Sequence, residues 1–268
     1  MLSAFALIFG KTWLTSVFLL SLRLATILMM TPLLYAISMP AVVRMLLVLG
    51  LSVALSAGLQ PGAVQPTDVG SLVQAAGVEV ALGATLALGI LLAFGAFSVA
   101  GHLLDVQIGF GIAQVFDPVS QSQVPILTSA FNQVAVLVFF LVDGHHALLR
   151  GIAFSLERFP LGVSWSLSEA ALPVFKQAAG LFSLGFALAA PVVFCILLVD
   201  LALGVVARNL PQMNMFAMGI PIKIVVGLAA LSLWFSGIGG VMHRVYGSIY
   251  TTWDQIFAVS NVVMQGVH

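Results

Sequence analysis

Six stretches of this chain contain no acidic or basic residue, and they constrain its fold more than any other feature. Each is 20 to 25 residues long, which is about the length that an α-helix needs to cross a bilayer. They are residues 24–43, 45–67, 80–104, 118–142, 177–199 and 224–243. Only 7% of the 268 residues are charged, whereas a soluble domain carries about 25%. The sequence therefore predicts an all-α membrane protein.

Proline, glycine and polar residues interrupt these stretches, and the breaks predict six long helices and two further ones. The long helices are expected at about 12–31, 41–59, 71–105, 126–142, 171–208 and 216–243, and the others at 144–159 and 244–268. Thr67 or Asp68 could cap the third long helix. Helices of 35 and 38 residues would be about 52 and 57 Å long. The two longest helices must therefore tilt, kink or project from the membrane.

Charge and cysteine content exclude several classes of protein. The net charge is zero, so no basic field indicates nucleic acid as a partner. The single Cys195 lies in an apolar run, and one cysteine excludes a disulfide framework and a cysteine-based zinc site.

The first segment does not have the pattern of a signal peptide. Lys11 follows the first apolar residues instead of preceding them, so we expect this segment to be retained rather than cleaved. No catalytic triad order, phosphate loop or zinc-protease motif is present, and we expect neither enzymatic activity nor a cofactor.

Residues 200–223 are polar although long apolar runs flank them. They contain Asp200, Arg208 and Lys223, which are three of the eighteen charged residues. Asp200, Gly204 and Arg208 share one face of a helix, with the Cα atoms of the two charged residues about 12 Å apart. This is far for an ion pair, so we expect each to find a partner on another helix or another chain. The simpler alternative is that these side chains snorkel at a helix end.

A second segment, residues 107–125, is nearly uncharged and combines amides with bulky apolar side chains. Gly109 and Gly111 give the backbone freedom around Phe110. Non-helical backbone at membrane depth is tolerated only inside protein or along a water-filled cavity. The segment could therefore plug a pore, although the residues alone favour an ordinary connector between helices.

Residues 143–150 begin with an aspartate and two histidines. Adjacent residues of a helix point in different directions, so His145 and His146 are not expected to chelate one ion. No further ligand follows at a metal-binding spacing, and we expect no metal. A helix start that Asp143 or Gly144 caps is the preferred interpretation.

Glu79, His102 and Asp105 share the predicted helix at 71–105. His102 and Asp105 are three residues apart and could meet on one face. A hydrogen-bonded helix end is a better explanation for them than a proton path.

Taken together, these segments resemble the FliR family, the flagellar members of the export-gate proteins of bacterial type III secretion, related to the virulence SctT family. Any single motif is weak, but the run Pro211–Asn214 followed by Pro221–Lys223 is specific in combination. The motifs are Gly101–Gly111 leading into Phe116-Asp117-Pro118 and Gln123; Gly144-His145-His146; Pro191–Leu198 leading into Asp200–Gly204; and Arg208–Asn214 with Gly219–Lys223.

The resemblance implies a fold and a function. It implies one export-gate domain over residues 1–268, with long kinked helices, in which about 1–165 resembles FliP and about 166–268 resembles the helical hairpin of FliQ. The chain would be a core subunit of a gate, with FliP-like and FliQ-like subunits, that passes unfolded flagellar proteins across the bacterial inner membrane at the flagellar basal body. FlhB-like and FlhA-like export components are further expected partners. The alternatives are a virulence secretion gate and, less favoured, a secondary transporter. A further rival is an intramembrane enzyme or metal protein that uses Asp143, His145 and His146.

The resemblance also implies roles for particular residues. Residues 106–124 correspond to the family's plug in the closed channel, which reverses the interpretation of this segment as a connector. Phe110 and Phe116 are then the best candidates for blocking side chains. The expected plug residues are Gly109, Phe110, Gly111, Ile112, Val115, Phe116, Asp117 and Pro118. The expected subunit contacts are Asp200, Gly204, Arg208, Gln212, Asn214 and Lys223.

Overall fold

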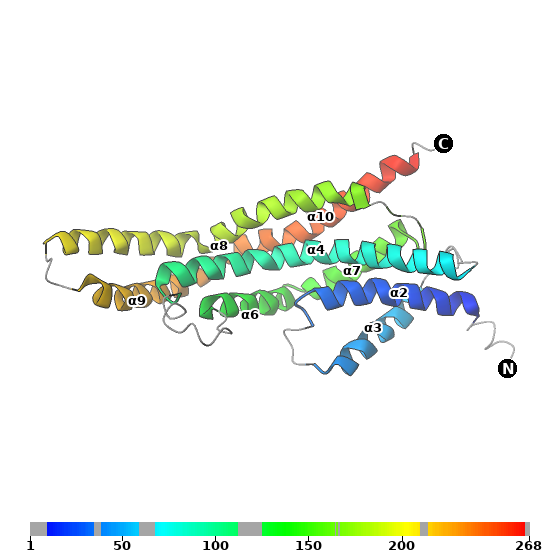
Figure 1. Ribbon diagram of the computed structural model, residues 1–268, viewed down its shortest axis with the longest axis horizontal. Helices are drawn as coiled ribbons and strands as arrows, with labels where there is room; N and C mark the ends of the chain where they lie inside the picture. The colour runs from blue at the N-terminus through cyan, green and yellow to red at the C-terminus, as the bar shows by residue number, and fades with distance from the viewer. Residues whose placement is uncertain are drawn as a thin grey trace. The chain divides into compact units, whose positions relative to one another are not determined.

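The computed structural model describes residues 10–34, 39–58, 68–111, 125–163, 165, 167–209 and 214–265, and these residues form helices and short turns. The prediction of an all-α fold is confirmed. In chain order the helices are α2 (Lys11–Met30), α3 (Ala41–Ser56), α4 (Val69–Ile108), α6 (Ile126–Leu141), α7 (Gly144–Arg158), α8 (Leu167–Asn209), α9 (Met215–Phe235) and α10 (Gly239–Gln265) (Figure 1).

The observed helices match the predicted ranges closely, except in the last third of the chain. The helix predicted at 216–243 is two helices, because α9 ends at Phe235 and α10 begins at Gly239. A turn separates them, in which the Gly237 N–H donates to the Trp234 carbonyl at 2.9 Å. The turn could not be predicted from the uncharged run 224–243, because serine and glycine can end a helix without adding charge.

Four helices are long and apolar enough to cross a membrane. They cover residues 12–30, 69–108, 170–209 and 217–235, and a fifth span results if α6 and α7 count as one broken span. The chain is thus a membrane protein by length and composition. α4 and α8 have 40 and 43 residues, or about 60 and 65 Å at 1.5 Å per residue, so both exceed the predicted lengths.

The start of α4 confirms Asp68 as a cap. Its Oδ1 accepts the N–H of Ser71 at 3.2 Å, and the Ser71 Oγ accepts the N–H of Asp68 at 3.2 Å. This reciprocal pair satisfies main-chain donors that a helix start leaves without partners. Hydrogen bonds from Ser71 lower the pKa of Asp68 below its ordinary value.

The chain divides into two compact units, each made of segments that are far apart in the sequence. Unit 1 contains residues 1–91, 139–177 and 248–268, and unit 2 contains residues 92–138 and 178–247. The helices α4, α6, α8 and α10 therefore contribute residues to both units. This division rests on compactness. The FliP-like and FliQ-like parts rest on resemblance and stay a prediction.

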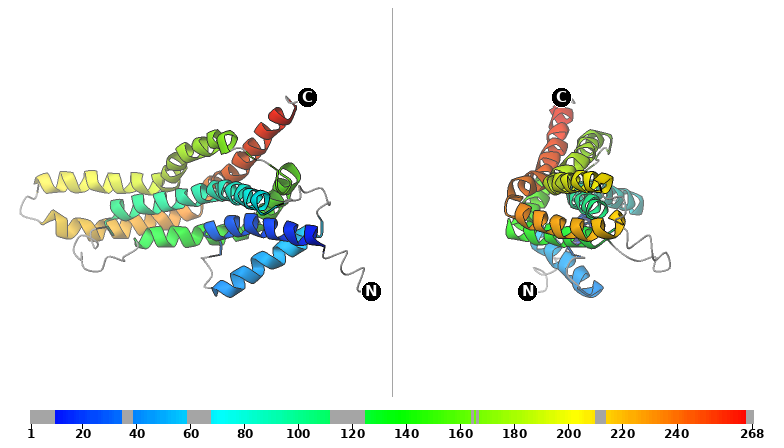
Figure 2. Two further views of the ribbon diagram at one scale, coloured as in Figure 1. Left: turned by 45° about the vertical axis from the view of Figure 1, so that its right-hand side comes forward. Right: turned by 90° about the vertical axis from the view of Figure 1, so that its left-hand side faces the viewer.

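In unit 1, α2 lies beside the first part of α4, and α3 packs against α2 (Figures 1 and 2). Close approach of α2 and α4 requires glycine at position 83, because a Cβ there would lie 2.9 Å from the Arg23 carbonyl oxygen. At this contact the Arg23 Nε donates to the Glu79 Oε2 at 2.6 Å, and both side chains are buried. This pairing was not predicted from the sequence, because the two residues come from different helices.

The Arg23–Glu79 pair is surrounded by further hydrogen bonds. Arg23 also donates to the carbonyls of Ser155 at 3.1 Å and Phe159 at 2.8 Å, and Glu79 Oε1 accepts the Gly162 N–H at 3.1 Å. A buried ion pair is tolerated when such bonds satisfy its remaining polar groups. The network therefore joins α2, α4 and α7 with the turn that follows α7.

In unit 2, the last part of α8 and α9 run side by side (Figure 2). Trp234 on α9 donates from its Nε1 to the Leu188 carbonyl on α8 at 2.8 Å. On the α10 side of the unit, the Tyr246 hydroxyl donates to the Ala135 carbonyl at 2.5 Å, and its ring stacks on Phe97 with centroids 5.7 Å apart. Aromatic side chains with a satisfied polar end thus join helices of this unit.

Candidate functional sites at the α4–α6 junction and on α8 and α9

Asp105, near the end of α4, holds the start of α6 in unit 2. Its carboxylate accepts the N–H groups of Leu127 at 3.0 Å and Thr128 at 2.9 Å, and the Thr128 hydroxyl at 2.8 Å. The first N–H groups of a helix have no partner within the helix, and a negative charge is favourable there. Asp105 therefore acts as the N-terminal cap of α6, although it belongs to another helix.

His102 joins this junction through Thr128. The His102 Nδ1 lies 2.8 Å from the Thr128 Oγ1. Because that hydroxyl has one proton and donates it to Asp105, it accepts from His102, which places the imidazole proton on Nδ1. The prediction of a hydrogen-bonded helix end for His102 and Asp105 is confirmed. Close packing here requires Gly101, because a Cβ at this position would clash with the Thr128 Cα.

Asp105 also closes the end of α4 through its main chain. Its carbonyl accepts the N–H groups of Gly109 at 3.2 Å and Gly111 at 3.0 Å. Gly109 has a φ of 102°, a conformation that glycine adopts without steric cost. Gly109 is thus the residue that ends the helix. One residue, Asp105, therefore bonds to the chain on both sides of residues 112–124.

The structure describes part of the predicted plug. Gly109, Phe110 and Gly111 follow α4 directly, and the Phe110 side chain is half-buried. The predicted plug residues Ile112, Val115, Phe116, Asp117 and Pro118 lie outside the described residues. Thr128 was not among the predicted site residues. Pro125, directly before the apolar run, marked the helix start, but no pattern in the sequence paired Thr128 with Asp105.

On α8 and α9, two predicted contact residues bind each other. The Lys223 Nζ lies 2.5 Å from the Asp200 Oδ1, with side-chain exposures of 24% and 39%. The expectation that Asp200 pairs with a residue of another helix is confirmed, and that residue belongs to this chain. Because both groups remain partly exposed, the pair contributes about 0–1 kcal/mol.

The other predicted contact residues have different surroundings. Arg208 is exposed in the last turn of α8, where a positive charge is favourable. A Cβ at Gly204 would meet nothing within 4 Å. Asn214 Oδ1 accepts the Ala217 N–H at 3.2 Å and caps α9, whereas Gln212 lies outside the described residues. Arg208 and Gly204 therefore face open space within the described part of the chain.

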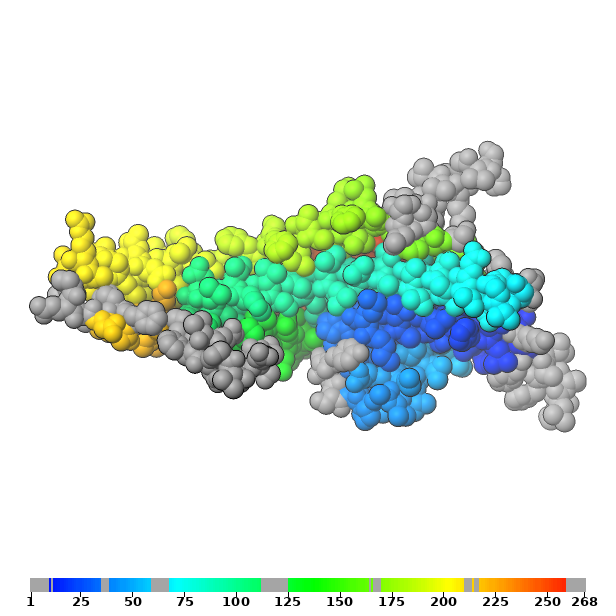
Figure 3. Space-filling model, in the orientation of Figure 1, coloured from blue at the N-terminus to red at the C-terminus, as the bar shows by residue number. Residues whose placement is uncertain are grey.

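The surface around these residues is apolar. Exposed side chains on α8 include Phe182, Phe186, Phe194, Leu201 and Val205, and Figure 3 shows the last part of α8, in yellow, on the surface. Only 28% of the most apolar stretch of α8 and 17% of that of α9 is buried, against 61% for α4. An apolar surface of this extent indicates contact with lipid or with other proteins.

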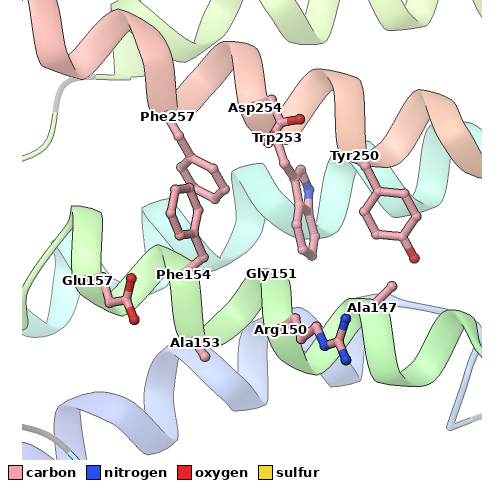
Figure 4. A pocket seen from close by; sticks show the side chains of 10 residues that line it. All are labelled: Ala147, Arg150, Gly151, Ala153, Phe154, Glu157, Tyr250, Trp253, Asp254 and Phe257. Atoms are coloured by element: carbon pink, nitrogen blue, oxygen red, sulfur yellow. The ribbon is translucent and has the colours of Figure 1, made fainter.

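A groove lies between α7 and α10 in unit 1 (Figure 4). It has a volume of about 570 Å³, and aromatic rings form much of its wall. Phe154 and Phe257 meet edge to face with centroids 5.3 Å apart. Its charged residues are Arg150, Glu157 and Asp254, and none of them forms an ion pair within the described part of the chain. The groove pairs no nucleophile with a base.

The start of α7 corrects one expectation. Ligand atoms of Asp143, His145 and His146 all lie within 4.8 Å of one another, and the two imidazole centroids are 4.2 Å apart. The two histidines do not point apart as expected, because the first turn of a helix has no preceding turn that restricts its rotamers. Asp143 occupies the predicted cap position, but its side chain makes no capping hydrogen bond.

Comparison with known proteins gives consistent matches. The family described as bacterial export proteins, family 1, matches residues 14–249. The flagellar biosynthetic protein FliR of Bacillus subtilis (strain 168) is 35% identical over 170 residues, which is 62% of this chain and 66% of that protein. FliR of Escherichia coli (strain K12) is 27% identical over 242 residues, or 89% of this chain and 91% of that protein.

A relative from another secretion system also matches. The secretion system apparatus protein SsaT of Salmonella typhimurium (strain LT2) is 26% identical over 158 residues, or 59% of this chain and 61% of that protein. The alignments with SsaT and with the Bacillus protein each cover slightly less than two thirds of the relative's length.

Proposed function

This chain belongs to the FliR family of bacterial export proteins, and on that premise we propose that it is a core subunit of a type III export gate. The gate would contain FliP-like and FliQ-like subunits, in contact with FlhB-like and FlhA-like components at the inner membrane. It would pass unfolded flagellar proteins and carry out no catalysis. The chain's part in it is a wall and entrance of the channel.

The observation that carries this proposal is the surface of α8 and α9. Large apolar side chains are exposed there, and the same helices carry the Asp200–Lys223 pair and the exposed Arg208. Charged groups are costly against lipid tails, whereas a partner subunit can offer both apolar and polar contacts. Protein neighbours therefore explain this surface better than lipid alone.

We further propose that residues 106–124 close the channel, with Phe110 and Phe116 as blocking side chains. The described ends of this segment support the proposal. Asp105 bonds to Gly109 and Gly111 before residues 112–124 and to Leu127 and Thr128 after them. A closing segment needs such fixed ends, because free ends would let it leave the channel.

Co-purification tests the gate. The tagged chain is expressed with its FliP-like and FliQ-like partners, and all three are expected to elute together. Arg208→Ala is expected to lower recovery of the complex several-fold, whereas Arg244→Ala, on the exposed part of α10, serves as a matched control. Recovery at the wild-type level with Arg208→Ala would show that this residue only snorkels. A stable lone chain that binds a small solute would instead support a transporter.

A gate of a virulence system is the second candidate, and the match to SsaT favours it. The two candidates differ in substrate rather than in architecture. Expression in a flagellated bacterium that lacks FliR separates them. Restored swimming supports the flagellar gate, and restored secretion in a strain that lacks SsaT supports the other.

A further inference from the structure

We propose that Asp143, His145 and His146, at the start of α7, form a binding site for a divalent transition-metal ion such as Zn²⁺ or Ni²⁺. This proposal is independent of the export function. It rests on the positions of three ligand groups, on the backbone that holds them, and on an imidazole nitrogen without a partner.

The three side chains already lie near the spacing of a metal site. Their ligand atoms are within 4.8 Å of one another, and the Asp143 Oδ1 is 3.5 Å from the His146 Nδ1. Ligands at about 2.0–2.2 Å from a tetrahedral metal lie about 3.3 Å apart. The side chains of Asp143 and His146 are 76% and 66% exposed, so rotation about their χ angles can close the remaining distance.

The backbone at this site is held in an uncommon conformation. Asp143 has a φ of 56° and a ψ of 27°, a left-handed conformation that is uncommon outside glycine, although aspartate adopts it more often than most residues do. Such conformations gather at functional sites. Asp143 stands at the N-terminal cap position, yet its side chain makes no capping hydrogen bond. Its carboxylate is therefore directed to His146 rather than to the helix.

Packing fixes the turn on which the ligands stand. A Cβ at Gly144 would lie 2.6 Å from the Phe139 ring, so this position requires glycine. The centroids of the Phe140 ring and the His145 imidazole are 5.5 Å apart. The Tyr250 hydroxyl donates to the Gly144 carbonyl at 3.4 Å. A metal site needs such support, because ligands that are held in place lose little entropy on binding.

His145 supplies the third observation. Its Nδ1 is buried and makes no hydrogen bond within the described part of the chain. A buried polar atom without a partner is unfavourable, and such an atom in a native protein calls for an explanation such as a bound ion. The imidazole is thus not committed to another protein group, and it stands beside two further ligands.

The ligand set selects the class of ion. Two imidazoles and one carboxylate suit Zn²⁺, Ni²⁺, Cu²⁺ or Fe²⁺, whereas Mg²⁺ and Ca²⁺ require mainly oxygen ligands. Three protein ligands leave at least one coordination position for water. A bound ion would link the residue before α7 to the first turn of α7 and would stiffen the turn after α6.

The experiment is a titration of the purified full-length chain, in detergent, with ZnCl₂ and separately with NiCl₂. The affinity tag must contain no histidine. Calorimetry is expected to show one ion per chain for the wild type. Asp143→Asn and His146→Ala, which alter exposed side chains, are each expected to weaken binding at least tenfold. His243→Ala, an exposed histidine on α10 outside the cluster, is the matched control and is expected to bind as the wild type does.

A second measurement covers variants that fold poorly. Zn²⁺ is expected to raise the thermal unfolding temperature of the wild type and of His243→Ala, but not of His146→Ala, because only a ligand of the folded state stabilises it. The proposal is overturned if the wild type binds no Zn²⁺ or Ni²⁺, if His146→Ala binds as tightly as His243→Ala, or if Mg²⁺ binds equally well. Co-purification with partner subunits is a separate measurement, so failure here leaves the proposed gate untouched.

Discussion

Two buried carboxylates organise the structure at the scale of single residues. Glu79 accepts from Arg23 and from Gly162, and Asp105 accepts from Leu127 and Thr128. In each case several donors from distant parts of the sequence converge on one charge, which is what makes its burial tolerable. Removal of one donor therefore leaves a buried carboxylate without a partner, whereas removal of the donor and the carboxylate together leaves no unpaired charge.

Arg23→Met is expected to lower the free energy of unfolding by about 3–5 kcal/mol, because it leaves Glu79 buried without a counter-charge. Thermal unfolding in detergent measures the effect. The double variant Arg23→Met/Glu79→Leu is expected to recover most of the loss, since no unpaired charge remains. Equal stability of the single variant and the wild type would contradict the role of the ion pair.

Asp105→Ala is expected to free the start of α6, because two main-chain N–H groups lose their acceptor. The cost is about 1–3 kcal/mol, seen as faster hydrogen exchange at Leu127 and Thr128. Asp254→Ala, which alters an exposed carboxylate of the groove, is the control. Unchanged exchange in Asp105→Ala would show that water replaces the carboxylate without loss.

At the scale of elements, glycines decide how closely helices approach. A Cβ at Gly151 on α7 would clash with the Trp253 ring on α10, whereas one at Gly50 on α3 would meet nothing within 4 Å. The Trp253 Nε1 also donates to the Leu86 carbonyl on α4 at 3.1 Å. The tryptophan is therefore held from two sides, and α7 must carry a residue without a side chain beside it.

Gly151→Ala is expected to destabilise the protein by about 1–3 kcal/mol through overpacking. The same change at Gly50 is expected to stabilise it by about 0.5–1 kcal/mol, because alanine favours the helix. Both variants add one methyl group to a helix, and only the packing around that group differs. Their unfolding temperatures in one detergent should therefore move in opposite directions. A shift in the same direction would refute the contact between Gly151 and Trp253.

At the scale of the whole molecule, the apolar surface of α8 and α9 and the junction at Asp105 both lie in unit 2. The proposed gate assigns them different tasks, the first in assembly and the second in closure. Variants on α8 should therefore change recovery of the complex, and changes in the closing segment should change leakage.

Deletion of residues 110–116 tests this separation. Cells with the deletion are expected to assemble the complex at wild-type levels and to leak ions or small molecules, because the proposed blocking side chains are gone. Membrane conductance and co-purification are measured in the same strain. Normal conductance with normal assembly would remove the plug from the proposal and leave the gate in place.

The sequence predicted local features well where one physical cause dominates. Apolar length marked the helices, and Asp68 marked the start of α4. The break between α9 and α10 was missed because Ser236 and Gly237 interrupt a helix without interrupting hydrophobicity. The two histidines of α7 were expected to point apart, as in a helix interior, but in the first turn their ring centroids lie 4.2 Å apart.

By itself, the sequence determined the helical class, the membrane-spanning lengths and the family, because these depend on composition, periodicity and ordered motifs along the chain. Only the tertiary structure decided which charges meet. Arg23 with Glu79, Asp200 with Lys223, and Asp105 with Thr128 are 56, 23 and 23 residues apart. The physical reason is that a buried charge must find a partner, while the choice of partner depends on how the helices pack.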